Sequence, residues 1–187
     1  ILQPEKEETY QFIEKLLSSV KENFSTNRVH IGMDEAVMLG LGNYLKENGY
    51  KKGSLIIREH CNRVVDICRK LELKPMIWSD MYIIANSTGG YYDLPENTDC
   101  SKWEKPKKDL GLVYWDYYHA DTRTYEKMLD IHAQLSDNII FAGGSWIWNG
   151  ISPNYSKTYA CTKAALSTCK KYNLKEVLCT AWMDNGA

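Results

Sequence analysis

The chain lacks the features that mark several classes of protein. No apolar run approaches the roughly 18 to 20 residues of a membrane span, and the N-terminal residues do not have the pattern of a signal peptide. The basic residues are scattered apart from "KWEKPKK" at 102–108, so the positive face of a nucleic-acid-binding protein is missing. With a formal net charge of −1, we expect a soluble, cytoplasmic protein with neither a nucleic-acid partner nor a membrane partner.

Signatures of cofactor binding are also missing. The six cysteines include no C-x-x-C pair, and no pair of Cys or His has the spacing of zinc ligands. No glycine-rich phosphate loop follows an apolar run, and no lysine stands where a Schiff base would form. We therefore expect buried free thiols in a reducing compartment, and neither a metal nor any other cofactor.

What the sequence does contain is an alternation of helical and strand-like segments. Apolar residues recur at steps of three and four over 5–24, and the same helical rhythm returns in three later segments. The later stripes are Ile57, Cys61, Val64, Cys68 and Leu71; Tyr125, Met128, His132 and Leu135; and Tyr159, Thr162, Leu166 and Cys169. Short apolar runs at 28–32, 75–79, 112–118, 139–143 and 177–182 predict strands of a parallel sheet that are buried on both faces. Between 81 and 111 no helical rhythm is sustained, and we expect a shortened helix with a lid-like excursion.

Polar and aromatic residues collect at the C-terminal end of every expected strand. They are Asp34 and Glu35, Trp78 and Asp80, Tyr114 and Asp116, Trp146 and Trp148, and Trp182 and Asp184. An open sheet gathers its site at one switch point, whereas a (β/α)8 barrel directs every strand end at one central cavity. We therefore predict an α/β fold, a (β/α)8 TIM barrel. Because a full barrel takes about 250 residues, residues 1–187 would be the C-terminal portion of a single catalytic domain, covering roughly strands 4 to 8 of a longer molecule.

The acidic pair Asp34 and Glu35 predicts acid–base chemistry on a sugar. Two neighbouring carboxylates raise each other's cost of ionising, and partial burial adds to it, so one can stay protonated while the other is an anion. Cleavage of a glycosidic bond needs this division of roles. Indole rings match the apolar faces of a pyranose. The expected pocket walls are Trp78, Trp146, Trp148 and Trp182, and the expected hydroxyl-binding groups are Asp116 and Asp184.

Other interpretations stay open on the residues alone. Asp34 and Glu35 could begin a helix, because anions suit the positive end of the helix dipole. Glu35 could join Asp116 and Asp184 as oxygen ligands of a divalent metal, as in a metal-dependent barrel lyase or isomerase. A non-catalytic carbohydrate-binding barrel would use the indoles without the acids. His30 is expected to be an internal hydrogen-bonding residue behind the acidic pair.

Five ordered motifs resemble a known family. "HIGMDEA", "MIWSDMY", "LVYWDYY", "GGSWIW" and "TAWMDNGA" are similar to the catalytic barrel of the family 20 glycoside hydrolases, the β-N-acetylhexosaminidases, in particular the hexosaminidase D-like branch. The resemblance covers essentially the whole chain. It implies an exo-acting, retaining hydrolase that removes terminal β-linked N-acetylglucosamine or N-acetylgalactosamine, with the substrate's own 2-acetamido group attacking the anomeric carbon.

The resemblance also implies roles for individual residues. Glu35 would be the general acid and then the base, and Asp34 would orient the acetamide N–H and stabilise the oxazolinium-like intermediate. Tyr114 would hydrogen-bond the acetamide oxygen and hold it close to the anomeric carbon. The outer hydroxyls would bind Asp116 and Asp184 within walls formed by Trp78, Trp146 and Trp182. The chain departs from the family pattern at Met33, where many members have glycine, and at Asp184, where many have glutamate.

Overall fold

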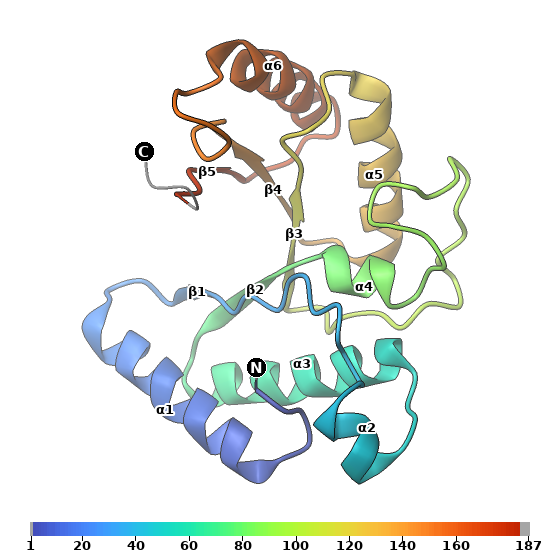
Figure 1. Ribbon diagram of the computed structural model, residues 1–187. Coiled ribbons are helices and arrows are strands. Elements are labelled where there is room, and N and C mark those ends of the chain that lie inside the picture. Colours follow the sequence, from blue (N-terminus) through green and yellow to red (C-terminus); the bar gives the residue numbers. More distant parts are fainter. Residues whose placement is uncertain (1, 184–187) are drawn as a thin grey trace. The chain divides into compact units, whose positions relative to one another are not determined.

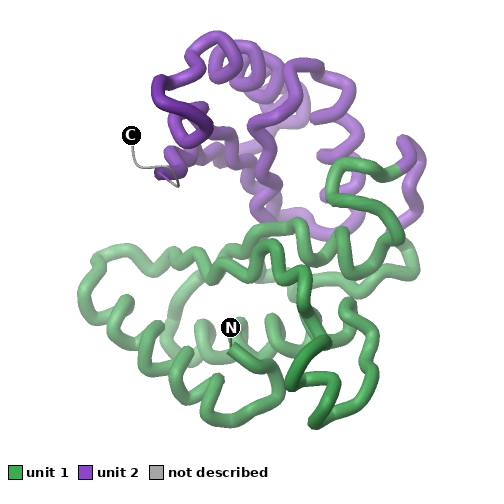
Figure 2. The backbone as a smooth tube through the Cα atoms, viewed as in Figure 1, with its two compact units in different colours: residues 1–94, 101–111 green, residues 95–100, 112–187 purple. Residues whose placement is uncertain are grey.

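A computed structural model describes residues 2–183 of the chain (Figure 1). The chain divides into two compact units, which Figure 2 distinguishes by colour. Unit 1 comprises residues 1–94 and 101–111, and unit 2 comprises residues 95–100 and 112–187. Helices and strands alternate in both units, and every strand pair described below is parallel, as the sequence predicted.

Unit 1 holds the first part of this alternation. Its elements are α1 (Glu7–Asn23), β1 (Arg28–His30), α2 (Asn43–Asn48), α3 (Gly53–Lys70), β2 (Lys74–Trp78) and α4 (Asp80–Ile84). Strands β1 and β2 pair in parallel, with Val29 opposite Pro75. Helices α1 and α3 lie side by side along these strands (Figure 1). The apolar stripes of the two helices form a core with Val29, Ile31 and Met33 of the first strand and its continuation.

Unit 2 repeats the arrangement with three strands. Its elements are β3 (Gly111–Trp115), α5 (Thr122–Leu135), β4 (Ile139–Gly144), α6 (Tyr155–Lys171) and β5 (Val177–Thr180). Strand β4 pairs in parallel with β3 on one side and with β5 on the other. Helices α5 and α6 begin with side-chain caps, because Asp121 accepts the backbone N–H of Thr124 and Asn154 accepts that of Lys157.

Two of the strand predictions need correction. Strands β2, β3 and β4 are mostly buried, but β1 is at best half-buried and β5 is largely exposed, with Val177 at 50%. Among the described strands, β1 pairs with β2 and β5 pairs with β4. A strand that is paired along one side only keeps more of its surface in contact with water.

The stripe predicted for α6 is also wrong in part. Tyr159 and Leu166 are exposed, whereas the buried face of α6 is made of Cys161, Ala164, Ala165, Thr168 and Cys169. Small side chains allow the helix axis to come close to the strands beneath it, so the larger residues lie on the flank. The six cysteines are free, as predicted, and Cys179 alone among them is exposed.

The long connection after α4 carries buried anchors in its first part. The shortened helix expected here is α4, but the excursion after it is anchored in unit 1. Tyr91 and Leu94 are buried, and the Tyr91 hydroxyl hydrogen-bonds the Ser79 hydroxyl at 2.7 Å. A segment with buried anchors opens only at a cost in free energy, and the lid-like excursion stays a prediction. The sequence reasoning also missed α2, a helix of six residues.

Candidate active site

The acidic pair lies in a tight turn directly after β1. Gly32, Met33 and Glu35 have φ angles of +69°, +70° and +48°. This left-handed region is costly for residues other than glycine, at about 1–3 kcal/mol each. Neither acid belongs to the first turn of a helix, because α2 begins only at Asn43, so the interpretation of the pair as helix-start residues is wrong.

The turn exposes both carboxylates. Asp34 and Glu35 are exposed to solvent in the structure, so the expectation that partial burial acts on the pair is corrected. The left-handed backbone at Met33 and Glu35 ends the strand alternation and rotates the chain out of the sheet. The two acids therefore stand at the carboxyl end of β1 as groups that a ligand in solution could reach.

Hydrogen bonds to β2 and α4 hold this turn in place. The Trp78 backbone N–H donates to the Gly32 carbonyl at 3.2 Å, which extends the β1–β2 pairing past the end of β1. The Glu35 backbone N–H donates to Asp80 Oδ2 at 2.8 Å, and Asp80 is fully buried. Asp80 therefore supports the acidic pair from behind. The sequence reasoning named this residue but gave it no role at the pair.

His30 lies behind the acidic pair, as predicted. Its Nδ1 accepts the Gly32 backbone N–H at 3.1 Å, and its ring centroid is 4.3 Å from that of Trp78. Burial lowers the pKa of His30, and the charge of Asp34 offsets part of this effect. A neutral imidazole that accepts at Nδ1 carries its proton at Nε2. That Nε2 is buried and finds no hydrogen-bond partner among the described residues.

In both units the strands present a helix side and an opposite side. Val29 and Ile31 pack on α1 and α3, so His30 between them points to the other side of β1. In unit 2, the Tyr114 ring packs on His132 of α5, with ring centroids 4.8 Å apart. Trp115 next to it therefore points to the side away from the helices.

Tyr114 and Asp116 consequently lie in the helix-side layer of unit 2. Tyr114 is fully buried, and its hydroxyl donates to Asp116 Oδ2 at 2.9 Å. Asp116 Oδ1 accepts the Tyr118 backbone N–H at 2.9 Å, and Asp116 Oδ2 is 2.8 Å from His119 Nδ1. The prediction that these two side chains lie with the indoles is wrong, because alternation along β3 places them on the opposite side. Asp116 instead fixes the turn after β3, and its hydrogen bond raises the pKa of His119.

The residues that follow the strands of unit 2 form an aromatic cluster with the last residue of β3. We use this name for the buried Tyr117, Trp146 and Trp148 with the half-buried Trp115 and Trp182 packed against them. Trp146 and Trp148 stack with ring centroids 4.8 Å apart, and the Trp182 indole N–H donates to the Tyr117 hydroxyl at 3.1 Å. The predicted residues Trp146, Trp148 and Trp182 are thus together.

Gly144 allows the cluster to approach β4 closely. A Cβ at this position would lie 2.9 Å from Tyr117 Cδ1 and 3.0 Å from Trp148 Cη2, which is too close for any side chain. The sequence reasoning missed Tyr117 and Trp115 as members of this group. The alternation of side chains along "YWDYY" indicated that Trp115 and Tyr117 share one side of the chain. Because the strand is apolar on both sides, the sequence alone did not reveal which side faces the helices.

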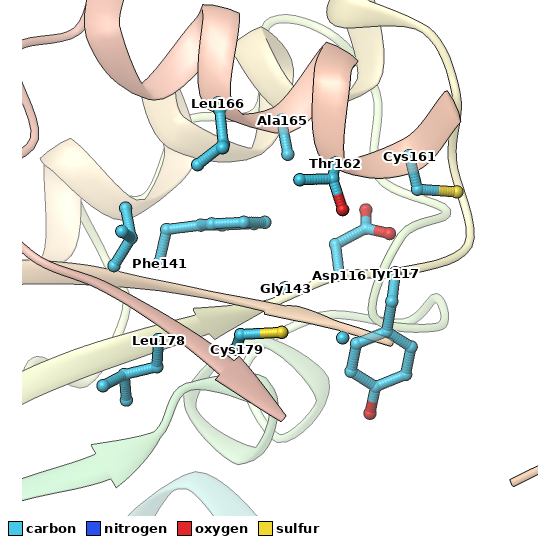
Figure 3. Close-up of a pocket in the computed structure, with 12 residues that line it drawn as sticks. Asp116, Tyr117, Phe141, Gly143, Cys161, Thr162, Ala165, Leu166, Leu178 and Cys179 are labelled. Atoms are coloured by element: carbon cyan, nitrogen blue, oxygen red, sulfur yellow. The ribbon is translucent and has the colours of Figure 1, made fainter. Parts of the chain in front are cut away.

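A pocket of about 170 Å³ lies on the helix side of unit 2, between α6 and strands β4 and β5 (Figure 3). Phe141, Leu166 and Leu178 contribute apolar walls, and Asp116 and Thr162 contribute oxygens (Figure 3). Asp116 and Tyr117 reach its end near the turn after β3, whereas neither the acidic pair nor any tryptophan lines it. Of the remaining predicted site residues, Trp78 is half-buried at the end of β2, and Asp184 lies outside the described residues.

Comparison with known families shows which family this chain resembles over most of its length. The model of the glycosyl hydrolase family 20 catalytic domain matches residues 1–134, which include the acidic pair, Asp80 and the turn after β3. The chain belongs to glycosyl hydrolase family 20. The matched part covers well over half of this family 20 chain, and the Trp146, Trp148 and Trp182 positions lie beyond it. A comparison with curated proteins finds no match.

Two further features of this family 20 chain concern ligands and membranes. Within residues 2–183, no three His, Cys, Asp or Glu side chains gather as metal ligands would. None of the helices in that part of the chain has the length and apolar character of a membrane span.

Proposed function

We propose that this chain is part of an exo-acting, retaining β-N-acetylhexosaminidase that cleaves terminal N-acetylhexosamine residues by substrate-assisted catalysis. One observation carries the proposal. In a family 20 catalytic domain, the pair Asp34 and Glu35 stands exposed at the carboxyl end of a parallel strand, and the turn that presents it is held by a buried acid. In a TIM barrel the active site is built at the carboxyl ends of the strands.

The positions of helices and aromatic side chains on opposite sides of the strands favour a barrel over an open sheet. His30 and Trp78 in unit 1, and Trp115 in unit 2, lie on the strand sides that face away from the helices of their own unit. In a TIM barrel the helices form the outer ring, so this side is the barrel interior. We propose that the five strands are strands 4 to 8 of the barrel.

The proposed reaction begins with proton donation to the glycosidic oxygen by Glu35. The substrate's acetamide oxygen attacks the anomeric carbon as the bond to the leaving group breaks, which gives an oxazolinium intermediate. Asp34 accepts the acetamide N–H and stabilises the positive charge of this intermediate. Water then attacks the anomeric carbon while Glu35 removes its proton, so the acetamide is restored and the configuration is retained.

We assign the contact to the acetamide oxygen to Tyr117 in place of Tyr114. Tyr117 lies with the indoles, whereas Tyr114 is enclosed between β3 and α5. Because the Trp182 indole donates to the Tyr117 hydroxyl, the proton of that hydroxyl is oriented away from the indole. In this proposal Trp78 and Trp182 wall the sugar, and Asp184 binds an outer hydroxyl.

The direct test is a kinetic comparison on a methyl β-N-acetylglucosaminide, whose poor leaving group needs protonation, made in the full natural polypeptide. Glu35→Gln and Asp34→Asn should each lower kcat by about 10²- to 10⁴-fold, the usual value of general acid–base catalysis and its electrostatic support. Glu22→Gln, on the exposed surface of α1, serves as the matched control and should leave kcat unchanged. A thiazoline that mimics the oxazolinium should inhibit strongly because it resembles the transition state.

The outcomes separate the competing functions. An unchanged rate for Glu35→Gln would remove this acid from the mechanism. Sugar binding without any turnover in the natural protein would favour a carbohydrate-binding barrel. Activity that disappears with a chelator and returns with a divalent metal would favour a metal-dependent enzyme.

A further inference from the structure

Asp80 is held rigidly at the start of α4. Its side chain has 0% exposure, and the next three residues, Met81, Tyr82 and Ile83, are buried at 3% or less. Helix α4 packs against α3 in the core of unit 1. The position of the Asp80 carboxylate is therefore set by the core of the unit and not by a mobile surface loop.

The residue that Asp80 contacts needs such support. The Glu35 backbone is left-handed, with φ +48°, and Met33 two residues earlier has φ +70°. The Glu35 N–H donates to Asp80 Oδ2 at 2.8 Å, a short hydrogen bond for an N–H donor. The Glu35 side chain itself is exposed, so the wall of a pocket does not fix its direction. The backbone at Glu35 decides where its carboxyl group begins, and Asp80 fixes that backbone.

We propose that Asp80 is a positioning residue for the general acid, acting through the backbone N–H of Glu35. The inference rests on the proposed function of Glu35 as acid and base. A general acid must be within hydrogen-bond reach of the leaving oxygen, and a misplacement of about 1 Å can lower the rate on the order of 100-fold. Loss of Asp80 should thus weaken protonation of the leaving group more than it weakens sugar binding.

The dependence of kcat on the leaving group distinguishes a positioning role from a merely structural one, because a structural role would lower kcat equally on all substrates. A nitrophenolate departs with little protonation, whereas an alkoxide or a sugar hydroxyl needs the acid. Asp80→Ala should therefore lower kcat on a methyl β-N-acetylglucosaminide by about 100-fold, but on a dinitrophenyl substrate by less than about 5-fold, with KM nearly unchanged on both. An equal loss of kcat on both substrates would contradict positioning.

Three further variants complete the experiment, all made in the full natural polypeptide. Asp80→Asn keeps an oxygen acceptor for the Glu35 N–H and should recover most of the rate on the methyl substrate. If Asp80→Ala does not fold, Asp80→Asn alone tests the inference. Its decrease in kcat is expected to be small, but it must be larger on the methyl substrate than on the dinitrophenyl substrate. Asp66→Ala removes a half-exposed carboxylate of the same unit that pairs with Lys107, and should leave both rates unchanged.

Glu35→Gln, measured in parallel, separates this inference from the proposed function. A leaving-group effect in Glu35→Gln but not in the Asp80 variants would overturn the positioning role alone. Absence of the effect in Glu35→Gln would overturn Glu35 as the acid, and the role of Asp80 with it.

Discussion

At the scale of single residues, the turn at the acidic pair has a strained backbone at Met33 that side-chain packing stabilises. Met33 stands at a φ of +70°, where glycine is favoured, and its side chain packs on the core formed by α1 and α3. The packing of a half-buried methionine offsets the cost of the left-handed backbone. This balance explains how a bulky residue is tolerated where the family pattern often has glycine.

An alanine–glycine comparison at this position isolates the backbone strain. Met33→Ala and Met33→Gly both lose the packing, but glycine alone relieves the strain. We expect Met33→Gly to be more stable than Met33→Ala by about 1 kcal/mol in urea unfolding. At Ala133, an exposed site in α5, Ala→Gly should instead destabilise by about 1 kcal/mol. The same sign at both sites would show that Met33 is not strained.

At the scale of elements, the alternation of β3 separates two kinds of side chain. Tyr114 and Asp116 tie the strand to the turn that follows and to α5, whereas Trp115 and Tyr117 belong to the side with the indoles. A single strand thus contributes both the structural hydrogen bonds and the aromatic groups of the candidate site. Because successive side chains along an extended chain point to opposite sides, the hydrogen-bonding residues and the aromatic residues can occupy the same segment.

Removal of one hydroxyl from each side of β3 tests this separation. Tyr117→Phe should lower kcat on the methyl substrate by about 100-fold, the usual cost of one lost donor to a developing charge. Tyr114→Phe should lower stability by roughly 1–2 kcal/mol through the lost hydrogen bond to buried Asp116, while kcat changes by about 2-fold at most. The opposite result would return the acetamide contact to Tyr114.

At the scale of the whole molecule, each unit contains a histidine that resists protonation, the half-buried His60 in unit 1 and the buried His132 in unit 2. Burial lowers the pKa of His60 in unit 1 and of His132 in unit 2 to about 4 in each case. An unfolded histidine has a pKa of about 6.5. Each folded pKa is therefore depressed, so its contribution to stability is complete above pH 6.5 and is lost as the pH falls toward 4.

This linkage predicts a steep loss of stability in mild acid. Each histidine should contribute on the order of 3 kcal/mol of destabilisation between pH 6.5 and pH 4, at about 1.4 kcal/mol per pH unit. Urea unfolding at pH 7, 5.5 and 4.5 measures the slope. His60→Gln and His132→Gln should be less stable at pH 7 but less sensitive to acid.

His119 supplies the matched control for the acid slope. Its pKa is raised by the hydrogen bond to Asp116, so below about pH 5.5 it is protonated in both the folded and the unfolded state. His119→Gln should therefore leave the slope between about pH 5.5 and pH 4.5 as it is in the natural protein. Slopes that remain unchanged in the His60 and His132 variants would contradict the linkage.

The sequence by itself determined the order of elements, the parallel α/β class and the acidic pair at the end of its strand. These are local properties, because helical and strand-like rhythms and strand-end positions depend on neighbouring residues. Only the tertiary structure decided which side of each strand faces the helices. That side enclosed Tyr114 and Asp116 against the helices and left Trp115 away from them. It also decided the role of Asp80, because the contact with Glu35 joins residues 45 positions apart, and no local pattern records such a pairing.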